Sequence, residues 1–528
     1  MTGVGTLVRL ALRRDRILLP VWILLIPVVV TATASAIAEL YADAGQRLAL
    51  AATVAANPAL RALTGPVYDA GSVGGLTAWR ATTVAVVLVS VMSVLLVVRH
   101  TRAEEETGRA ELVGSGVVGR HALTLAAVLV AVAADVMIAV LIAAGLTGLG
   151  LPVAGAVAFG LAVGATGWTF TGLAVLAAQV TSSARTATGL GSAALGLAFA
   201  LRAMGDAASV DTLSWLSPFG WAQRVRAFAG EQWWVLLLYA GATLALVTAA
   251  ALLARRRDLG AGLWAPRAGR VAAPPSFGSP AALAWRLHRG TLAGWTAGFA
   301  GVGLMLGSLA ESVGDILDDN PQLGAVLRQL STGRGALVDV FLSAEIGLLG
   351  LAAGGFAVQA TLTMRAEEAA MRAEAVLATA VPRWRWTLSH LVWALAGTAL
   401  IMGVAGLAEG LAHGVRVGDP VGEAARLTGA ALVQVPAAWV LAGLAMLLVG
   451  AAPRLTAVAW AALVGCLILG QLGELLRLDE RIRALSPYFH LPRVPGEDVA
   501  VAPLAWLAAT AAVLALAGVT AFGRRDLG

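Results

Sequence analysis

Long apolar segments recur along this chain, and they constrain its fold more than any other feature. Each is about 20 residues long, which is enough for an α-helix to cross the hydrocarbon core of a bilayer. Only 13% of the 528 residues are charged, whereas about a quarter are charged in soluble domains. We therefore predict an all-α polytopic membrane protein. The twelve expected transmembrane helices are 17–38, 77–98, 122–147, 155–179, 186–204, 233–254, 291–310, 343–363, 389–408, 429–450, 456–475 and 503–523.

The arginines indicate which side of the membrane each loop faces. All 37 basic residues are arginine, and an N-terminus inside the cell places 23 of them in cytoplasmic segments. The positive-inside rule therefore favours cytoplasmic N- and C-termini. We expect a multi-pass protein of the cell (plasma) membrane. Its basic charge is explained by arginines at the cytoplasmic ends of helices, so no nucleic-acid partner is expected.

A charged motif occurs twice, each time after a predicted span. Residues 102–111 read Arg-Ala-Glu-Glu-Glu-Thr-Gly-Arg-Ala-Glu, and residues 365–374 read Arg-Ala-Glu-Glu-Ala-Ala-Met-Arg-Ala-Glu. In each copy a glutamate, Glu105 or Glu368, stands four residues before an arginine, Arg109 or Arg372. This is the favoured order for an ion pair on a helix, worth about 0.2–0.5 kcal/mol. Both motifs are therefore predicted to form short helices at the cytoplasmic surface.

Further markers show that the chain is duplicated. Asn57-Pro58-Ala59-Leu60 returns as Asn320-Pro321-Gln322-Leu323, and the same 263-residue spacing separates the charged motifs. Leu-Ser-Pro-Phe at 216–219 resembles Leu-Ser-Pro-Tyr at 485–488, and Arg-Arg-Asp-Leu-Gly stands at 256–260 and 524–528. Because six spans is an even number, the two halves are expected to be parallel repeats. The predicted parts are a six-helix half at 1–254, a cytoplasmic linker with an interfacial helix at 255–285, and a second half at 286–528.

Missing residue types exclude several chemistries. The chain contains no lysine, so it cannot form a phosphate-binding loop of the G-x-x-x-x-G-K-[ST] type. Cys466 is its only cysteine, and its six histidines show no metal-ligand spacing. An integral-membrane enzyme is the weakest hypothesis, because no histidine, cysteine or paired-acid constellation supports it. We expect a transporter rather than an enzyme, with no metal and no cofactor bound by this chain.

The charged motif between the second and third helices of a six-helix unit resembles permeases of type-2 ABC exporters. The tandem arrangement, with Leu-Ser-Trp-Leu-Ser-Pro-Phe-Gly-Trp-Ala-Gln at 213–223, Arg-Arg-Asp-Leu-Gly-Ala-Gly-Leu at 256–263 and Trp-Arg-Leu at 285–287, resembles the actinobacterial exporters of polyketide antibiotics, the tetronasin-type permeases. The second half departs from this pattern: Met371 replaces Gly108, and Tyr488-Phe489 replace Phe219-Gly220. The two docking sites are therefore not expected to be identical.

The resemblance implies a permease that exports hydrophobic or amphipathic compounds, as in antibiotic or multidrug efflux. Two copies of a separate ABC ATP-binding protein would bind ATP and Mg²⁺ and drive transport. The residues expected to couple to that protein are Arg102, Glu104, Glu105, Arg109, Glu111, Arg365, Glu367, Glu368, Arg372 and Glu374. The residues that could line the substrate cavity are Met92, Phe199, Phe356, Gln359 and Gln471. Packing against neighbouring helices is the favoured role for any single one of them, and Gln359 and Gln471 are the preferred contacts because an amide in the bilayer needs a partner or a water-filled cavity.

Two alternatives remain open. A solvated loop helix whose charges satisfy each other would also explain one copy of the motif, although two matched copies favour docking to a partner. A proton-coupled secondary transporter of twelve helices is the alternative function. Against it, this sequence has no repeated buried carboxylate that could carry protons. Asp135 lies within a span, where an ionisable residue is a functional candidate, and a structural hydrogen bond is its favoured role. Glu345, Glu409 and Glu474 are expected near span ends, within reach of the interface.

Overall fold

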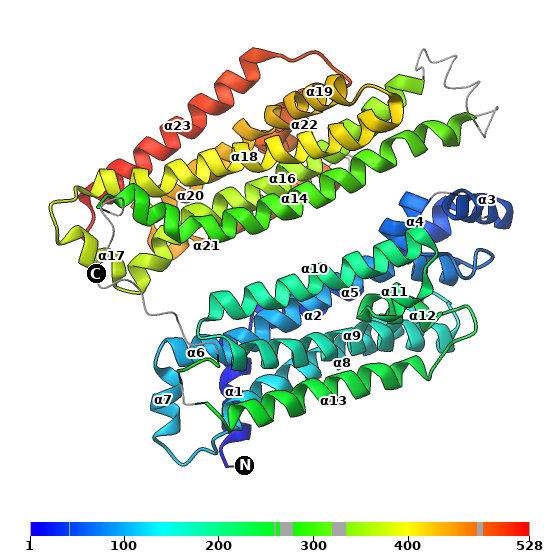
Figure 1. The fold of residues 1–528 in the computed structure, drawn as a ribbon, viewed down its shortest axis with the longest axis horizontal. Coiled ribbons are helices and arrows are strands. Elements are labelled where there is room, and N and C mark those ends of the chain that lie inside the picture. Colours follow the sequence, from blue (N-terminus) through cyan, green and yellow to red (C-terminus); the bar gives the residue numbers. More distant parts are fainter. Residues whose placement is uncertain are drawn as a thin grey trace. The chain divides into compact units, whose positions relative to one another are not determined.

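The protein is entirely helical in the part of the chain that the computed structural model describes, residues 2–41, 43–56, 58–257, 260–263, 278–318, 334–472 and 479–526. The chain divides into two compact units, Met1–Gly269 and Arg270–Gly528 (Figure 1). Within these described residues, eleven helices are long and apolar enough to cross a membrane. The expected eleventh span is a shorter apolar helix, Ala457–Gly470. The all-α polytopic fold is thereby confirmed.

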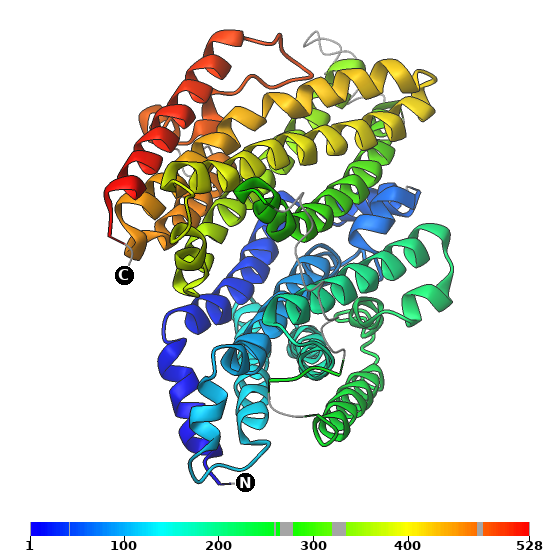
Figure 2. The same ribbon diagram turned by 60° about the vertical axis from the view of Figure 1, so that its left-hand side comes forward.

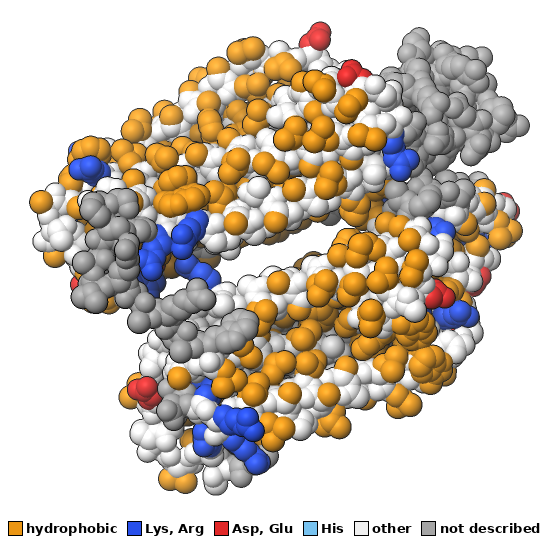
Figure 3. All heavy atoms as spheres, in the orientation of Figure 1, with side chains coloured by type: hydrophobic (Ala, Val, Ile, Leu, Met, Phe, Trp, Pro, Cys, Tyr) orange, Lys and Arg blue, Asp and Glu red, His pale blue; other side chains and the backbone are white. Residues whose placement is uncertain are grey.

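Apolar side chains cover the visible flanks of the helices, and charged side chains gather toward helix ends (Figure 3). This distribution is what a bilayer requires, because burying a charge in hydrocarbon is costly and apolar side chains lose nothing there. Of the Asn-Pro sequences that mark the duplication, Asn57 and residues 320–323 lie outside the described part of the chain. Most of the expected linker, residues 255–285, also lies outside it.

Unit 1 is built from helices that run between its two ends. α9 lies in the middle and packs against α5, α8 and α13 (Figure 1). Two short helices, α11 and α12, fold back between α10 and α13 and cover one end. The principal helices are α1 (Val4–Arg14), α2 (Leu18–Leu40), α3 (Ala44–Ala56), α4 (Pro58–Thr64), α5 (Val73–His100), α8 (Ala122–Gly148), α9 (Val153–Val180), α10 (Ala184–Ala208), α11 (Asp211–Trp215), α12 (Pro218–Arg224) and α13 (Val235–Ala254).

Glycines allow α8 and α9 to approach closely. A Cβ atom on Gly160 would lie 2.4 Å from the carbonyl oxygen of Ala139, and one on Gly164 would lie 2.9 Å from that of Asp135. Such small residues permit backbone contact between membrane helices, where packing drives association. Phe159 and Phe170 fill the remaining space in the buried core of the unit.

Unit 2 contains two tightly packed helix pairs, α14 with α18 and α20 with α23. One expected span is divided at Gln434 into α19 and α20, and Pro436 stands in the first turn of α20. A proline there lacks the N–H that would continue the preceding helix. The helices are α14 (Pro280–Asp318), α16 (Arg334–Ala369), α17 (Arg372–Leu377), α18 (Arg383–Val417), α19 (Pro420–Val433), α20 (Val435–Ala451), α21 (Ala457–Leu472), α22 (Glu480–Arg483) and α23 (Val501–Arg524).

The segments before the first and seventh spans differ between the units. In unit 1, α1 is a separate helix that packs on α8 through Leu7 and Ala11, and it lies beside α7 (Figure 2). α2 starts after Asp15, which is fully buried and bonds to His100 at 2.5 Å. In unit 2 the corresponding segment is the first part of the continuous helix α14, so no separate helix precedes the seventh span within the described residues 278–318.

Candidate functional site

The charged motif of unit 1 forms two short helices separated by a sharp turn. α6 (Arg102–Glu106) follows α5 after Thr101, and α7 (Arg109–Gly114) begins directly after Gly108. Gly108 has a φ of +72°, in the left-handed region that glycine adopts without steric cost. This residue ends the first helix and redirects the chain.

Glu105 is the centre of the ion pairs in unit 1. It lies 2.8 Å from Arg102 and 2.6 Å from Arg257, with only 8% of its side chain exposed. Arg257 also donates to the Gln179 side chain at 2.6 Å, and Arg102 donates to the Ala178 carbonyl at 3.0 Å. These bonds fasten the motif to the end of α9 and to the segment after α13. A buried charge that loses such partners is strongly destabilising.

The other buried glutamate of unit 1, Glu104, pairs across the turn. It lies 3.5 Å from Arg109 and also bonds to Arg14 of α1. The expected pair between Glu105 and Arg109 is therefore wrong. The i,i+4 rule applies within a continuous helix, and the left-handed turn at Gly108 interrupts the helix between these two residues.

Unit 2 repeats the central network position by position. Glu368 lies 3.0 Å from Arg365 and 2.5 Å from Arg525, and 9% of its side chain is exposed. Arg525 has the place in the second Arg-Arg-Asp-Leu-Gly sequence that Arg257 has in the first. In each unit one arginine and the glutamate come from the start of the motif, and the second arginine comes from the Arg-Arg-Asp-Leu-Gly segment. The start of the motif is the separate helix α6 in unit 1 but the end of the long helix α16 in unit 2, so the short helix predicted there is not separate.

The pair across the turn is repeated as well. Glu367 lies 2.8 Å from Arg372, so the expected pair between Glu368 and Arg372 is wrong for the same reason. Met371 takes the role of the glycine, with a φ of +59°. A side chain is rarely found in this conformation, and unit 2 adopts it because the turn is built in the same way.

The motif therefore has an inner and an outer set of charges. The inner set is bonded within its own unit and consists of Arg102, Glu104, Glu105, Arg365, Glu367 and Glu368. The outer set is turned away from the bundle: 56% of the Arg109 side chain and 58% of the Arg372 side chain are exposed. We call the exposed residues of each motif its outer face. It consists of Arg109, Glu111 and Leu112 in unit 1 and of Met371, Arg372 and Glu374 in unit 2.

Arg257 and Arg525 are functional-site residues that the sequence analysis missed. Both stand in a repeated sequence that it used only as a marker of duplication. The signal was nevertheless present, because two motifs that recur together at matched positions, one basic and one acidic, are candidates to pair with each other. Only the structure shows that the pair forms.

The residues expected to line a substrate cavity lie in different environments. Met92 and Phe356 are buried inside their own units, at 2% and 1% exposure. Phe199 is partly buried and lies 4.8 Å below the guanidinium of Arg202. Gln359 is exposed and accepts a hydrogen bond from Trp295 at 2.9 Å. The side chain of Gln471 lies outside the described part of the chain.

The acidic residues within the spans are also placed. Asp135 is fully buried on α8 and accepts a hydrogen bond from Ser93 at 3.2 Å, as its favoured structural role requires. Glu409 is fully buried on α18, so the expectation that it reaches the interface is wrong. Within the described residues, neither of its carboxylate oxygens has a hydrogen-bond partner. Glu474 lies outside the described residues.

Comparison with known proteins identifies relatives of the whole chain. Residues 277–523 match the family model described as the C-terminal domain of the multidrug efflux system permease Rv1217c. The permease protein of that name from Mycobacterium tuberculosis (strain ATCC 25618 / H37Rv) is 45% identical over 527 residues. The alignment covers 100% of this chain and 95% of that relative.

Proposed function

The chain belongs to the family of the multidrug efflux system permease Rv1217c, and from this membership we propose that it is the membrane subunit of an ATP-driven ABC exporter. It is a permease with many membrane-spanning helices, and its family name refers to multidrug efflux. The proposed substrates are hydrophobic or amphipathic compounds. The proposed location is the plasma membrane, with both termini in the cytoplasm.

The observation that carries the proposal is the matched ion-pair network of the two units. Each network ties the charged motif at the end of a span to the Arg-Arg-Asp-Leu-Gly segment of the same unit and leaves an arginine and a glutamate exposed. Surface loops do not need a rigid, doubly anchored base. A rigid base is useful where a helix must transmit force, because a loosely held segment would move without moving its span.

We propose that the outer face of each motif binds one copy of a separate ABC ATP-binding protein. ATP and Mg²⁺ would then be bound in that partner, since this sequence contains no phosphate-binding loop. The inner charges would be positioning residues that couple a displacement of the outer face to α5 in unit 1 and to α16 in unit 2. Gln359 and Phe199 remain candidates for substrate contact.

The test is co-purification of the chain with the ATP-binding protein encoded beside it. Reversal of the two exposed glutamates of the outer face, Glu111→Arg with Glu374→Arg, should reduce the recovered complex at least tenfold and abolish ATP-dependent transport. The thermal unfolding midpoint should stay within about 2 °C, because neither glutamate has an ion pair in the described part of the chain and exposed charges contribute little to stability. Charge reversal at Glu105 and Glu368 is a poorer test, because it would break the inner network.

The matched control is Glu39→Arg, which reverses an exposed glutamate at the far end of α2. This variant should bind the partner and transport as the unaltered chain does. Full assembly and transport by the Glu111→Arg, Glu374→Arg variant would overturn the proposed docking site.

One observation favours a second candidate function. Glu345, which is partly buried, and the buried Glu409 are electrostatic neighbours inside unit 2, on α16 and α18, and carboxylates within membrane spans occur in proton-coupled transporters. The two functions differ in their energy source. Efflux that is driven by a proton gradient without an ATP-binding protein, and that is lost in Glu409→Gln, would favour secondary transport over the ABC exporter.

A further inference from the structure

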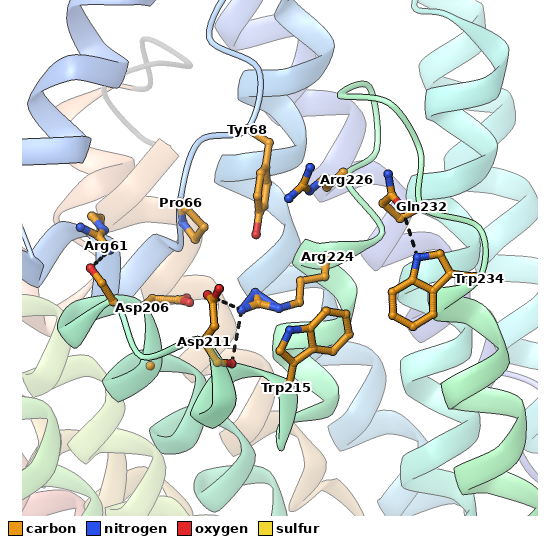
Figure 4. Close-up of a pocket in the computed structure, with 12 residues that line it drawn as sticks. Arg61, Pro66, Tyr68, Asp206, Asp211, Trp215, Arg224, Arg226, Gln232 and Trp234 are labelled. Atoms are coloured by element: carbon orange, nitrogen blue, oxygen red, sulfur yellow. Dashed lines mark hydrogen bonds and ion pairs between the residues drawn. The ribbon is translucent and has the colours of Figure 1, made fainter.

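A pocket of about 610 Å³ lies at the end of unit 1 opposite the charged motif (Figure 4). It is formed by the segment between α4 and α5, the last turn of α10, the two short helices α11 and α12, and the segment before α13. Its volume falls within the range of small-molecule sites. The charged and aromatic residues of its lining are Arg61, Tyr68, Asp206, Asp211, Trp215, Arg224, Arg226 and Trp234.

The acidic residues of the lining already have cationic partners. Asp211 bonds to Arg224 at 2.7 Å. Asp206 lies 3.5 Å from the buried guanidinium of Arg202 and accepts a hydrogen bond from Ser214 at 2.9 Å. Neither carboxylate is therefore free to repel an anion or to neutralise a further arginine.

Two arginines of the pocket keep an uncompensated charge. Arg61 donates to the hydroxyl of Ser209 at 2.8 Å, which carries no charge. Arg226 stacks on the ring of Tyr68 at 4.9 Å. No carboxylate lies within 4.0 Å of either guanidinium in the described chain. A guanidinium fork matches the geometry of a carboxylate and can bind it through two parallel hydrogen bonds.

The backbone fixes the position of Arg226. This residue has a φ of +50°. Its loop is held by a hydrogen bond of 2.8 Å from the backbone N–H of Gln232 to the backbone carbonyl of Val225. A non-glycine residue in this region is a strained conformation of the kind that is concentrated at binding sites. The result is an exposed guanidinium that points into the pocket next to Tyr68 (Figure 4).

Aromatic rings supply the apolar wall. Trp215 and Trp234 stack with their ring centres 5.5 Å apart and an angle of 25° between their planes, and the guanidinium of Arg224 lies 4.8 Å from the centre of the Trp215 ring. Burial raises the pKa of Tyr68 above its usual value, so its hydroxyl stays protonated and can donate a hydrogen bond to an anion. Flat apolar walls beside cationic donors suit an aromatic molecule with one acidic group.

We propose that this pocket binds small aromatic molecules that carry a carboxylate. Arg61 and Arg226 would bind the carboxylate, and Trp215 and Trp234 would contact the ring. The proposal goes beyond the exporter function and does not depend on it, because binding here requires no ATP-binding partner. If the motif faces the cytoplasm, the pocket opens on the outer side of the membrane.

The test uses 2-naphthoate and the uncharged 2-naphthamide, which has the same shape. Binding to the purified full-length chain in detergent is measured by equilibrium dialysis. Naphthoate should bind at least ten times more tightly than the amide, and Arg226→Gln and Arg61→Gln should each weaken naphthoate binding at least fivefold. Neither substitution leaves a carboxylate without a partner. The control Arg80→Gln, an exposed arginine of α5 outside the lining, should change binding less than twofold.

Equal binding of the acid and the amide would overturn the proposal, as would arginine variants that bind naphthoate normally. Competition separates a carboxylate site from a lipid site. If short-chain phosphatidylglycerol displaces naphthoate at a concentration at least ten times below that at which naphthoate itself binds, the pocket prefers a phosphate headgroup and the proposal fails. A variant that unfolds is detected by its thermal midpoint and is replaced by Arg226→Lys, which keeps the charge and should retain part of the binding.

Discussion

Met371 adopts a left-handed conformation that glycine adopts at the equivalent turn of unit 1, and this difference is measurable. The left-handed region costs a residue with a Cβ atom about 1–2 kcal/mol. We predict that Met371→Gly stabilises the protein by about 1 kcal/mol and that Gly108→Ala destabilises it by a similar amount. A Cβ on Gly108 would meet no atom within 4 Å, so only the backbone conformation is tested. Thermal unfolding in detergent checks both signs, and an unchanged midpoint in both variants would contradict the argument.

The inner ion pairs give a second prediction at the scale of residues. Arg257→Gln would leave Glu105 buried with Arg102 as its remaining cation, and loss of a charged partner costs about 1–3 kcal/mol. Arg525→Gln should cost a similar amount in unit 2. Arg109→Gln, which removes an exposed charge, should cost less than about 1 kcal/mol. Comparable midpoints for the Arg257→Gln and Arg109→Gln variants would show that the inner network does not stabilise the motif.

The sequence predicted which residues of the motif matter but not how they pair. Helical spacing favoured Glu105 with Arg109, and the structure pairs Glu105 with Arg102 and Arg257 instead. The partner Arg257 is 152 residues away. A helix rule describes neighbours on one helix and contains no information about a distant segment that folds back onto it.

Among the helices, the contact between α8 and α9 depends on small side chains. Gly160→Ala places a Cβ atom 2.4 Å from a backbone oxygen of α8, and backbone atoms cannot move aside as a flexible side chain can. We predict a loss of about 1–3 kcal/mol. The matched control is Gly189→Ala on α10, where a Cβ would meet nothing within 4 Å. That variant should be neutral or more stable by up to about 1 kcal/mol, because alanine is the better helix former.

Thermal unfolding compares the substitutions at Gly160 and Gly189 directly. If thermal unfolding shows equal midpoints for Gly160→Ala and Gly189→Ala, the close approach of α8 and α9 does not contribute to stability. Transport by the Gly160→Ala protein then becomes informative, since altered activity with unaltered stability would assign the contact to a moving part of the unit.

The sequence predicted where helices lie better than it predicted where each helix begins or is interrupted. Apolar length identifies spans because every backbone group in a bilayer must be bonded within its own helix. Length alone did not reveal that α14 runs on from the segment before it, or that a proline at 436 divides one span in two.

For the molecule as a whole, the duplication stays a prediction that rests on sequence motifs repeated in both halves. The structure divides into two compact units, Met1–Gly269 and Arg270–Gly528. We predict that residues 1–269 and 270–528, expressed separately, each insert into membranes and each retain helical circular dichroism. Each unit has buried core residues of its own, so each should unfold with its own transition. Complete degradation of one half when it is produced alone would contradict this.

Both halves lie on one polypeptide, and this has an evolutionary consequence for the turn at Gly108 and Met371. In a permease made of two identical chains, every substitution would appear at both turns at once. Here a substitution in one turn leaves the other turn unchanged. One half can therefore acquire a strained or destabilising residue while the other half keeps the original one. The unequal turns, set on otherwise matching charge networks, are what such independent drift of duplicated segments produces.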